Sequence, residues 1–319
     1  MTTEFALQVR NLTRRFGATL AVDQLSLDVI RGEVFGFLGP NGAGKTTSIN
    51  IMVGLLAPTS GDVFIEGQSV RAQRGEVQRH IGVCPQQNVL WDKQTCLEQL
   101  EFIGVNYGIS RRLARRRGAE LLEALGLTAK SNELAGRLSG GMKRRLNLAL
   151  ALVHDPHIIF LDEPEAGLDP QSRVLVRDLI RQLARHKTVV LTTHNMDEAE
   201  RLADRVAIID YGRLLVVDTP DALKRKLGEG SVLEIELEFR SGTVEGQSIQ
   251  RMLDCLKPGF PEAVVINNIL ILRGPELSAQ LPDVLRLIET GGMWAASIHM
   301  RANTLEDVFL SLTGRGMRE

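Results

Sequence analysis

Residues 39–46 read Gly-Pro-Asn-Gly-Ala-Gly-Lys-Thr and follow the apolar run Val34–Leu38. That run predicts a buried strand, and the segment Ser48–Leu56 after the loop has the pattern of a helix. A strand, a loop of the form G-x-x-x-x-G-K-[ST] and a helix, in this order, are typical of a phosphate-binding loop. The glycines let backbone N–H groups face the phosphates, and the start of the helix adds a partial positive charge.

Two side chains of this loop have specific expected tasks. Lys45 supplies a point charge to the β/γ-phosphates, and the Thr46 hydroxyl is placed to hold Mg²⁺. A chance glycine-rich turn is the alternative, but every fixed position of the pattern and both flanks match. The candidate nucleotide-binding residues of the loop are Gly39, Asn41, Gly42, Gly44, Lys45, Thr46 and Thr47.

Composition sets broad bounds. The 319 residues suffice for one large and one small domain, and 44% hydrophobic residues allow an ordinary core. A net charge of −1 gives no general attraction to nucleic acid or acidic lipid. Three cysteines without a C-x-x-C pair indicate a reducing compartment.

The sequence shows no targeting or membrane-spanning segment. Met1–Glu4 lacks the basic and apolar regions of a signal peptide, so none is expected. No run of 18 apolar residues occurs, so we expect the chain not to span a membrane.

Residues 1–228 alternate strand-like and helix-like segments, which predicts an α/β domain with a mainly parallel sheet. Residues 88–150 are rich in Arg and Leu and predict a helical insertion between sheet strands. The expected strands are Leu7–Val9, Leu25–Val29, Val34–Leu38, Val63–Ile65, Ile158–Leu161, Val189–Thr192 and Val206–Ile209.

Residues 229–319 show a different pattern of strand-like and helix-like segments, which predicts a separate small domain. Its expected order is a strand (232–239), a helix (247–256), two strands (262–266 and 268–273), a helix (277–290), a strand (295–299) and a helix (304–313). The order βαββαβ suggests an α+β module of ferredoxin-like type. None of its residues falls in a phosphate or carboxylate motif, so we expect no chemistry and no contact with ATP there.

Three further places in the first domain carry candidate catalytic residues. The strand Ile158–Leu161 leads into Asp162, suited to hold Mg²⁺ through water, and Glu163, suited to act as general base. His194 follows another strand, where it can donate to the γ-phosphate. Gln86 ends the run Ile81–Pro85, where its amide can touch Mg²⁺ or the attacking water. The alternatives are a helix-capping acid pair, a surface or core histidine and an ordinary loop glutamine.

Ser139, Gly140 and Gly141 precede a helix expected to begin at Met142 and predict a second anion site. Two half-sites within one fold cannot close on the same nucleotide. A head-to-tail pair of chains would bring them together, with two ATP molecules between.

With these motifs in place, the chain resembles the ATP-binding subunit of an ABC transporter. The resemblance covers residues 1 to about 228: Walker A is Gly39–Thr46, the Q-loop is Gln86, the signature is Leu138–Met142, Walker B is Ile158–Glu163, the D-loop is Ala166–Asp169 and the H-loop is His194. The strings Cys84–Gln86, Ser139–Arg145 and Thr304–Phe309 resemble the daunorubicin-resistance-type subfamily, whose members serve ABC-2-type exporters. Its nearest eukaryotic likeness is the lipid-transporting A subfamily.

The resemblance implies an ATPase that uses ATP and Mg²⁺ and drives export of a drug, lipid or polysaccharide. Implied partners are an integral-membrane permease and a second copy of the chain, with no nucleic acid. The implied location is cytoplasmic, peripheral on the inner face of the cell membrane. It also implies that Asp169 contributes to nucleotide binding and that Phe16 stacks on adenine, where the family usually has Tyr.

Glu165 also departs from the family, which usually has Thr at this position. A third carboxylate there would raise the pKa of Glu163 or repel phosphate, unless it faces solvent. It is the only support for a regulatory protein that holds ATP without hydrolysis. A soluble ABC ATPase acting on nucleic acid or ribosomes is another alternative, although such members usually have two cassettes or long insertions.

Two basic runs and one tryptophan each have two possible roles. Residues Arg111–Arg117 are expected to form a solvated helix face, with an anion-binding surface as the alternative. Residues Lys143–Arg145 are expected to serve phosphates or a facing subunit. Trp91 is either an interface anchor for the membrane partner or part of the core.

Overall fold

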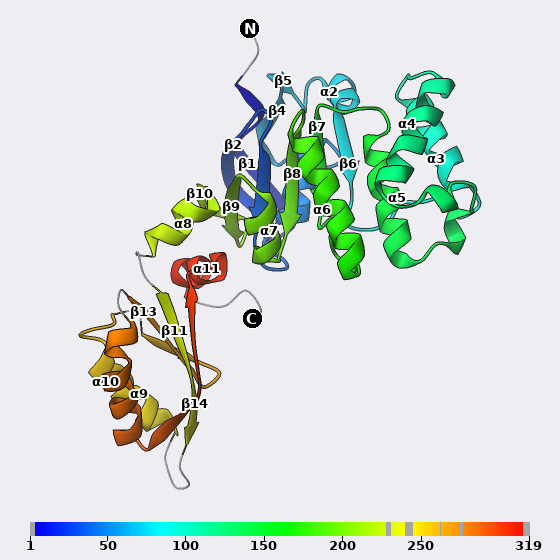
Figure 1. The fold of residues 1–319 in the computed structure, drawn as a ribbon. Helices are drawn as coiled ribbons and strands as arrows, with labels where there is room; N and C mark the ends of the chain where they lie inside the picture. Colours follow the sequence, from blue (N-terminus) through cyan, green and yellow to red (C-terminus); the bar gives the residue numbers. More distant parts are fainter. Residues whose placement is uncertain (1–3, 228–230, 240–244, 262, 275–276, 315–319) are drawn as a thin grey trace. The chain divides into compact units, whose positions relative to one another are not determined.

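The structure is a computed structural model that describes the chain except residues 1–3, 228–230, 240–244, 262, 275–276 and 315–319. The described residues form two compact units that meet in sequence at Pro220 and Asp221 (Figure 1). The expected domain boundary, between residues 228 and 229, and the first residue of the expected strand 262–266 lie outside the described residues.

Two sheets form the first unit. One is antiparallel, with the order β2-β1-β4-β5, and its strands are β1 (Phe5–Phe16), β2 (Thr19–Ile30), β4 (Ser60–Ile65) and β5 (Gln68–Ser69). The other has the order β10-β9-β3-β8-β7-β6, parallel except at β10, and its strands are β3 (Val34–Leu38), β6 (Ile81–Cys84), β7 (Ile158–Asp162), β8 (Thr188–Thr193), β9 (Arg205–Asp210) and β10 (Arg213–Asp218). Together with the helices, they confirm the predicted α/β class with a mixed sheet.

The hydrophobic core lies between these sheets. Alternate residues of β1 and β2 turn inward, and β3 is buried along its whole length because both of its faces are covered. Phe37 and Phe160 from the parallel sheet pack in one cluster with Leu7 and Val9 of β1 and Ile51 of α1. The helices of this part are α1 (Lys45–Met52), α2 (Arg74–His80), α6 (Pro170–Ala184) and α7 (Met196–Leu202).

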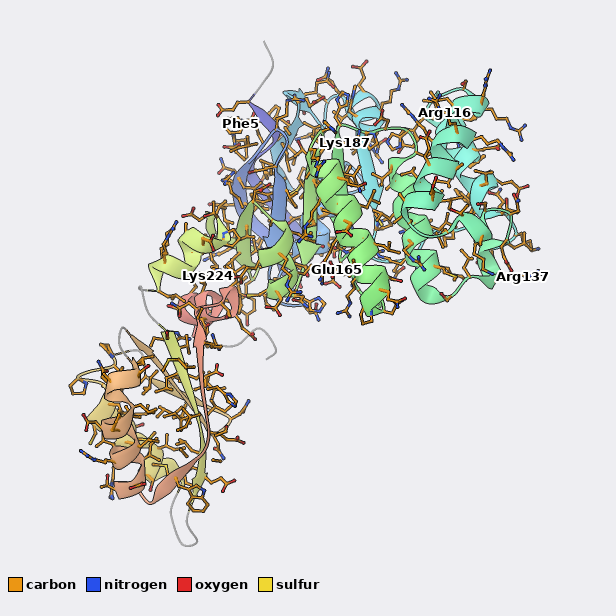
Figure 2. All side chains as sticks on the ribbon, in the orientation of Figure 1. Phe5, Arg116, Arg137, Glu165, Lys187 and Lys224 are labelled. Atoms are coloured by element: carbon orange, nitrogen blue, oxygen red, sulfur yellow. The ribbon has the colours of Figure 1, made fainter. Side chains whose placement is uncertain are left out.

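A helical layer is inserted between β6 and β7, as the sequence predicts. It consists of α3 (Cys96–Asn106), α4 (Arg111–Ala124), α5 (Gly140–Leu152) and two short 3₁₀ turns, Thr128–Lys130 and Ala135–Arg137. Arg116 points outward from α4 (Figure 2) and pairs with Glu120, while Arg111 and Arg115 pair with Glu101. The expectation of a solvated basic face is confirmed for these three arginines.

The second unit begins at Asp221, within α8 (Pro220–Lys226), and contains one antiparallel sheet of order β12-β13-β11-β14. This is the strand order of a ferredoxin-like module, and the buried faces of α9 and α10 pack against the sheet. Its elements are β11 (Ser231–Phe239), α9 (Glu245–Leu256), β12 (Val264–Ile266), β13 (Ile269–Gly274), α10 (Leu277–Thr290), β14 (Met293–Ala302) and α11 (Leu305–Thr313).

No helix in the described ranges is long and apolar enough to cross a membrane.

Candidate functional site

The glycine-rich loop leaves the carboxyl end of β3 and enters α1. Gly42 and Gly44 adopt φ values of 81° and 99°, a left-handed conformation that glycine reaches without strain. A Cβ on Gly44 would lie 2.4 Å from the carbonyl oxygen of Ala21, and one on Gly39 would lie 2.4 Å from that of Ile209. Glycine is therefore required at both positions for the loop to pass close to β2 and β9.

Lys45 and Thr46 begin α1 inside this loop. The Lys45 ammonium is buried and donates hydrogen bonds to the carbonyl oxygens of Gly39 (2.6 Å) and Pro40 (3.0 Å). Burial lowers the pKa of Lys45, while the charges of Glu163 and Asp162 raise it. The Thr46 hydroxyl donates to Asp162 Oδ2 at 3.0 Å, so the loop is connected directly to the end of β7.

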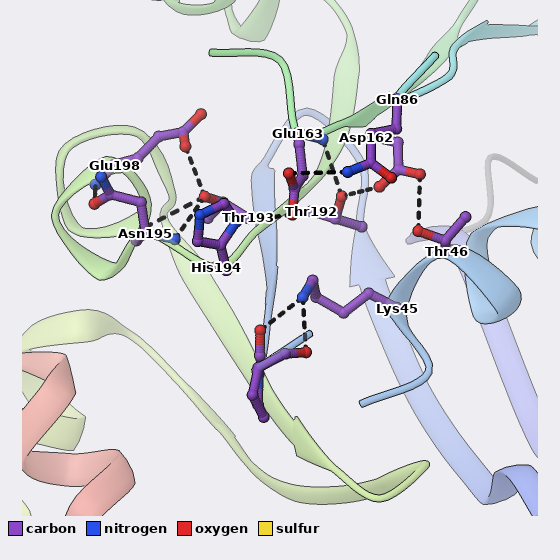
Figure 3. A network of polar contacts seen from close by, with 12 residues as sticks. Lys45, Thr46, Gln86, Asp162, Glu163, Thr192, Thr193, His194, Asn195 and Glu198 are labelled. Carbon is purple, nitrogen blue, oxygen red and sulfur yellow. Dashed lines mark hydrogen bonds and ion pairs between the residues drawn. The ribbon is translucent and has the colours of Figure 1, made fainter. Parts of the chain in front are cut away.

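Glu163 lies at the centre of a polar network that joins three loops (Figure 3). Its Oε2 accepts a hydrogen bond from Gln86 Nε2 at 3.2 Å, and its Oε1 lies 2.8 Å from His194 Nδ1. Its backbone N–H donates to Thr192 of β8, and its φ of 51° is unusual for a residue other than glycine. This turn places the carboxylate beyond the carboxyl end of β7 rather than in line with the strand.

A cavity of about 220 Å³ opens between the loop and this carboxylate. Most of the predicted loop residues line this cavity, together with the Q-loop glutamine and Glu163. Its lining consists of Ala21, Asn41, Gly42, Gly44, Lys45, Thr46, Thr47, Gln86 and Glu163.

Several predicted site residues are not among the residues that line this cavity. Three of them contact residues that do: the Gly39 carbonyl oxygen binds Lys45, Asp162 binds Thr46 and His194 lies against Glu163. Three further groups have other contacts. Ser139 caps α5 by accepting a hydrogen bond from Met142 N, so the helix begins at Gly140 rather than at Met142. Asp169 caps α6 by accepting hydrogen bonds from the Ser172 N–H (2.9 Å) and hydroxyl (2.7 Å). Phe16 is the last residue of β1 and is 46% exposed. The Arg14 guanidinium lies over its ring, 4.4 Å from the ring centroid. Roles for these residues toward ATP stay predictions.

Arg144 is a buried connector that no motif in the sequence predicts. Its guanidinium donates to the carbonyl oxygens of Pro85, Gln86, Asp162 and Glu163, so it joins the Q-loop to the end of β7. Arg145 donates to the Leu125 carbonyl oxygen at 2.7 Å. The expectation that the run Lys143–Arg145 serves phosphates or a facing subunit is wrong for both arginines, because backbone carbonyls of the same chain bind them.

Thr192 is a second connector that the sequence did not single out. Its hydroxyl donates to Asp162 Oδ1 and accepts from the backbone N–H of Glu163. It therefore orients both acids at once. No pattern predicts this task, since a threonine in a buried strand is also an ordinary β-former.

Glu165, labelled in Figure 2, is a buried residue that is bound to Arg177. Arg177 Nε and Nη2 donate to the two carboxylate oxygens at 2.5 and 2.6 Å. This bidentate pair compensates the third carboxylate inside the fold, so Glu165 neither faces solvent nor lines the cavity. The support for a protein that binds ATP without hydrolysing it is thereby removed.

Glu198 of α7 is a buried carboxyl group behind the H-loop. Its Oε2 accepts a hydrogen bond from the Thr193 hydroxyl at 2.6 Å, while its Oε1 has no hydrogen-bond partner among the described residues. Burial raises the pKa of Glu198 to about 7, Thr193 lowers it, and the charge of Glu165 raises it. The folded chain therefore holds a proton here that the unfolded chain releases near pH 4.5.

This raised pKa predicts that the contribution of Glu198 to folding stability is fully present below pH 4.5 and falls as the pH rises from 4.5 to 7. We expect Glu198→Gln, which is neutral at every pH, to match wild type near pH 4.5. At pH 8 the variant should be more stable than wild type by on the order of 2 kcal/mol. This is less than the full conversion of the pKa shift at about 1.4 kcal/mol per pKa unit, because the buried site relaxes when it is charged. Urea unfolding at both pH values measures the difference. Glu120→Gln, an exposed control, should change stability by less than about 0.5 kcal/mol at either pH; an equal effect of both variants would contradict the assignment.

Comparisons with known proteins agree with this geometry. Residues 22–166 match the family model described as ABC transporter. The chain is 39% identical over 316 residues to Nod factor export ATP-binding protein I of Burkholderia lata, covering 98% of both chains. It is 37% identical over 311 residues to daunorubicin resistance ATP-binding protein DrrA2 of Streptomyces coeruleorubidus, covering 97% of this chain and 95% of that one.

A match to a longer protein also occurs. ABC transporter A family member 5 of Dictyostelium discoideum is 34% identical over 321 residues, which are 96% of this chain but only 19% of that protein. The likenesses to the daunorubicin-resistance type and to the A subfamily are both confirmed.

Among solved structures, a dimeric ATP-binding cassette in a post-hydrolysis state, bound to ADP and Pi, superposes with a TM-score of 0.62 at 28% identity. The match covers 67% of this chain and 98% of that one. The fold, the order of motifs and two relatives aligned over nearly their whole length lead to one conclusion: this chain belongs to the ABC transporter family, as an ATP-hydrolysing, ATP-binding cassette.

Proposed function

We propose that this chain is the energy-supplying subunit of an exporter and hydrolyses ATP to drive a separate membrane permease. The observation that carries the proposal is the Glu163 carboxylate, held between Gln86 and His194 at the edge of the cavity that contains Lys45. Two relatives aligned over nearly their full length are named for export or drug resistance. They favour export over action on nucleic acid or ribosomes.

In the proposed mechanism, each side chain has one task. Lys45 exchanges its two carbonyl partners for β/γ-phosphate oxygens. Glu163 accepts a proton from the attacking water, and His194, hydrogen-bonded to Glu163, donates to the γ-phosphate. The Gln86 side chain donates to Glu163, and its carbonyl oxygen accepts a hydrogen bond from Arg144 of α5, so it is placed to relate hydrolysis to movement of the helical layer.

The donor set at the end of β7 fits Mg²⁺. Thr46 Oγ1 and the Asp162 carboxylate are hard oxygen donors 3.0 Å apart, and the side-chain oxygen of Gln86 would complete the set. A bound Mg²⁺ would neutralise charge on the β- and γ-phosphates.

A second copy of the chain would complete the ATP site. At the start of α5, Ser139 and Gly140 are exposed and Gly141 is half-buried, and none of the three lines the cavity of its own chain. Their free N–H groups suit the phosphates of a nucleotide held by another copy. We therefore propose a head-to-tail dimer with Asp169 near the interface, since Gly141 would place a Cβ 3.7 Å from its carboxylate.

An exposed apolar patch on the helical layer is the proposed contact with the permease. Trp91 is 40% exposed and packs edge-on against Phe102, with 5.4 Å between ring centroids. Val105 lies one helical turn further along α3 and is also exposed. Gln99 holds the Trp91 backbone from both sides, donating to its oxygen and accepting from its N–H at 3.1 Å each. The patch is thus a rigid, exposed surface. Docking of the permease on this surface would place the chain peripherally on the cytoplasmic face of the cell membrane.

We expect Trp91→Ala to reduce transport at least about tenfold while leaving basal ATPase activity within about twofold, because an interface anchor is removed without touching the cavity. Transport and ATPase rates of the chain reconstituted with the permease that co-purifies with it provide the measurement. Trp294→Ala is the matched control, since Trp294 is 39% exposed but lies in the second unit. Equal losses in both variants, or loss of folding in Trp91→Ala, would argue against the docking role.

We further propose that residues 229–319 hold two chains near each other between ATP cycles, which raises their effective concentration. The second unit has its own core and lines no part of the ATP cavity. Truncation at Gly228 should leave ATP affinity within about threefold while weakening dimer formation, measured by nucleotide titration and sedimentation. A truncated chain that folds but no longer binds ATP would disprove this division.

A further inference from the structure

Two histidines and a glutamate meet at the amino ends of β6 and β7. His80 ends α2 directly before β6, and His157 directly precedes β7. The His157 N–H donates to the His80 carbonyl oxygen at 2.8 Å, and the following residues, Ile81 and Ile158, pair across the two strands. This backbone pairing holds the imidazole rings side by side, 5.0 Å apart between centroids and tilted by 42°.

Glu66 completes the cluster from the turn between β4 and β5. Its Oε2 lies 3.1 Å from His157 Nδ1, and its Oε1 accepts a hydrogen bond from Arg31 Nη1 at 2.6 Å. One ligand atom from each of Glu66, His80 and His157 lies within 4.8 Å of the other two. Hydrogen bonds from His157 and Arg31 lower the pKa of Glu66 against the raising effect of burial, so the carboxylate is ionised near neutral pH.

We propose that Glu66, His80 and His157 form a binding site for a transition-metal cation of the zinc class. Two imidazole nitrogens and one carboxylate oxygen are a common zinc donor set, with water in the fourth position. Metal–ligand bonds of about 2.0–2.2 Å require the ligand atoms to approach one another by roughly 1 Å. The half-exposed His157 side chain is free to make that movement. Arg31 then holds the outer oxygen of the ligating carboxylate, as outer-shell partners do in metal sites.

The site is separate from the ATP cavity. The histidines lie at the amino end of β7, whereas Asp162 and Glu163 lie at its carboxyl end, about 13 Å away along a five-residue strand. A bound ion would join the β4–β5 turn of the antiparallel sheet to β6 and β7 of the parallel sheet. Metal binding therefore stabilises the first unit without entering the hydrolysis reaction.

The test is zinc titration of the full, tag-free chain by calorimetry and by thermal unfolding in the absence of nucleotide. We expect wild type to take up one zinc ion at this cluster and to unfold about 5 °C higher with saturating zinc than with a chelator. His80→Ala and His157→Ala should each weaken zinc binding at least about tenfold. His80→Gln and His157→Gln give the same comparison if an alanine variant fails to fold.

Two controls separate this site from other zinc ligands of the chain. His186→Ala removes an exposed histidine outside the cluster, and His194→Ala removes the ring beside Glu163; both should retain zinc binding at the cluster. Cobalt(II) should give visible absorption bands of tetrahedral geometry that vanish in His157→Ala but persist in His194→Ala. A zinc effect that persists in the His80 and His157 variants, or one lost only in His194→Ala, would overturn the proposal. The absence of any zinc effect in wild type would leave only the hydrogen bond between Glu66 and His157 and would overturn it too.

Discussion

Glu163→Gln is expected to lower the ATP turnover rate by about 10³-fold while leaving ATP affinity nearly unchanged. The amide retains the size of the side chain and its contacts with Gln86 and His194, but it cannot accept a proton from water. Because ATP then stays bound, the variant should accumulate as an ATP-bound dimer. Phosphate release measures turnover, and size-exclusion chromatography with Mg-ATP measures the dimer.

Glu165→Gln is the matched control for this experiment. It changes the neighbouring carboxylate, whose charge Arg177 compensates away from the cavity. We expect it to retain turnover within about tenfold, with its main effect on stability. Wild-type turnover in Glu163→Gln would exclude Glu163 as the base, and a larger loss in Glu165→Gln would transfer the role to that residue.

Lys45→Ala should weaken ATP binding about 100-fold. The Lys45 ammonium is buried in the loop among groups that would receive the phosphates, and losing a buried, hydrogen-bonded charge partner costs about 3 kcal/mol. Titration with a fluorescent ATP analogue provides the measurement. Lys130→Ala removes a surface lysine paired with Glu133 and should bind ATP as wild type does. Unchanged affinity in Lys45→Ala would mean that the loop does not hold the phosphates.

Both experiments concern residues that local sequence alone singled out. The strand Val34–Leu38 has the predicted bounds, and the candidate phosphate-binding residues between Asn41 and Thr47 line one cavity. Gly39, the first residue of the motif, is not among the lining residues. Local sequence suffices here because the motif is continuous. Glycine at fixed positions determines the path of the loop, and the apolar run before it must form a buried strand.

Strands with one exposed face were harder to delimit. The expected strand Leu7–Val9 is only part of β1, which runs from Phe5 to Phe16. Beyond Val9 the strand carries polar residues that face outward in an antiparallel sheet, so its pattern contains no continuous apolar run. In the second unit, the expected strand 232–239 agrees closely with β11 (Ser231–Phe239), whose residues alternate, but the expected strand 295–299 is only the middle of β14 (Met293–Ala302).

Contacts between distant segments were decided only by the tertiary structure. Arg144, read from sequence as a residue for phosphates, binds four backbone carbonyl oxygens because α5 packs against the ends of β6 and β7. Glu165 meets Arg177 because the loop after β7 folds back onto α6. The sequence by itself therefore determined the family and the phosphate loop, and it singled out the two acids at the end of β7 as candidates, since these depend on residues adjacent in the chain. Which charges are paired, and which side chains orient those acids, depends on distances across the fold that no local spacing encodes.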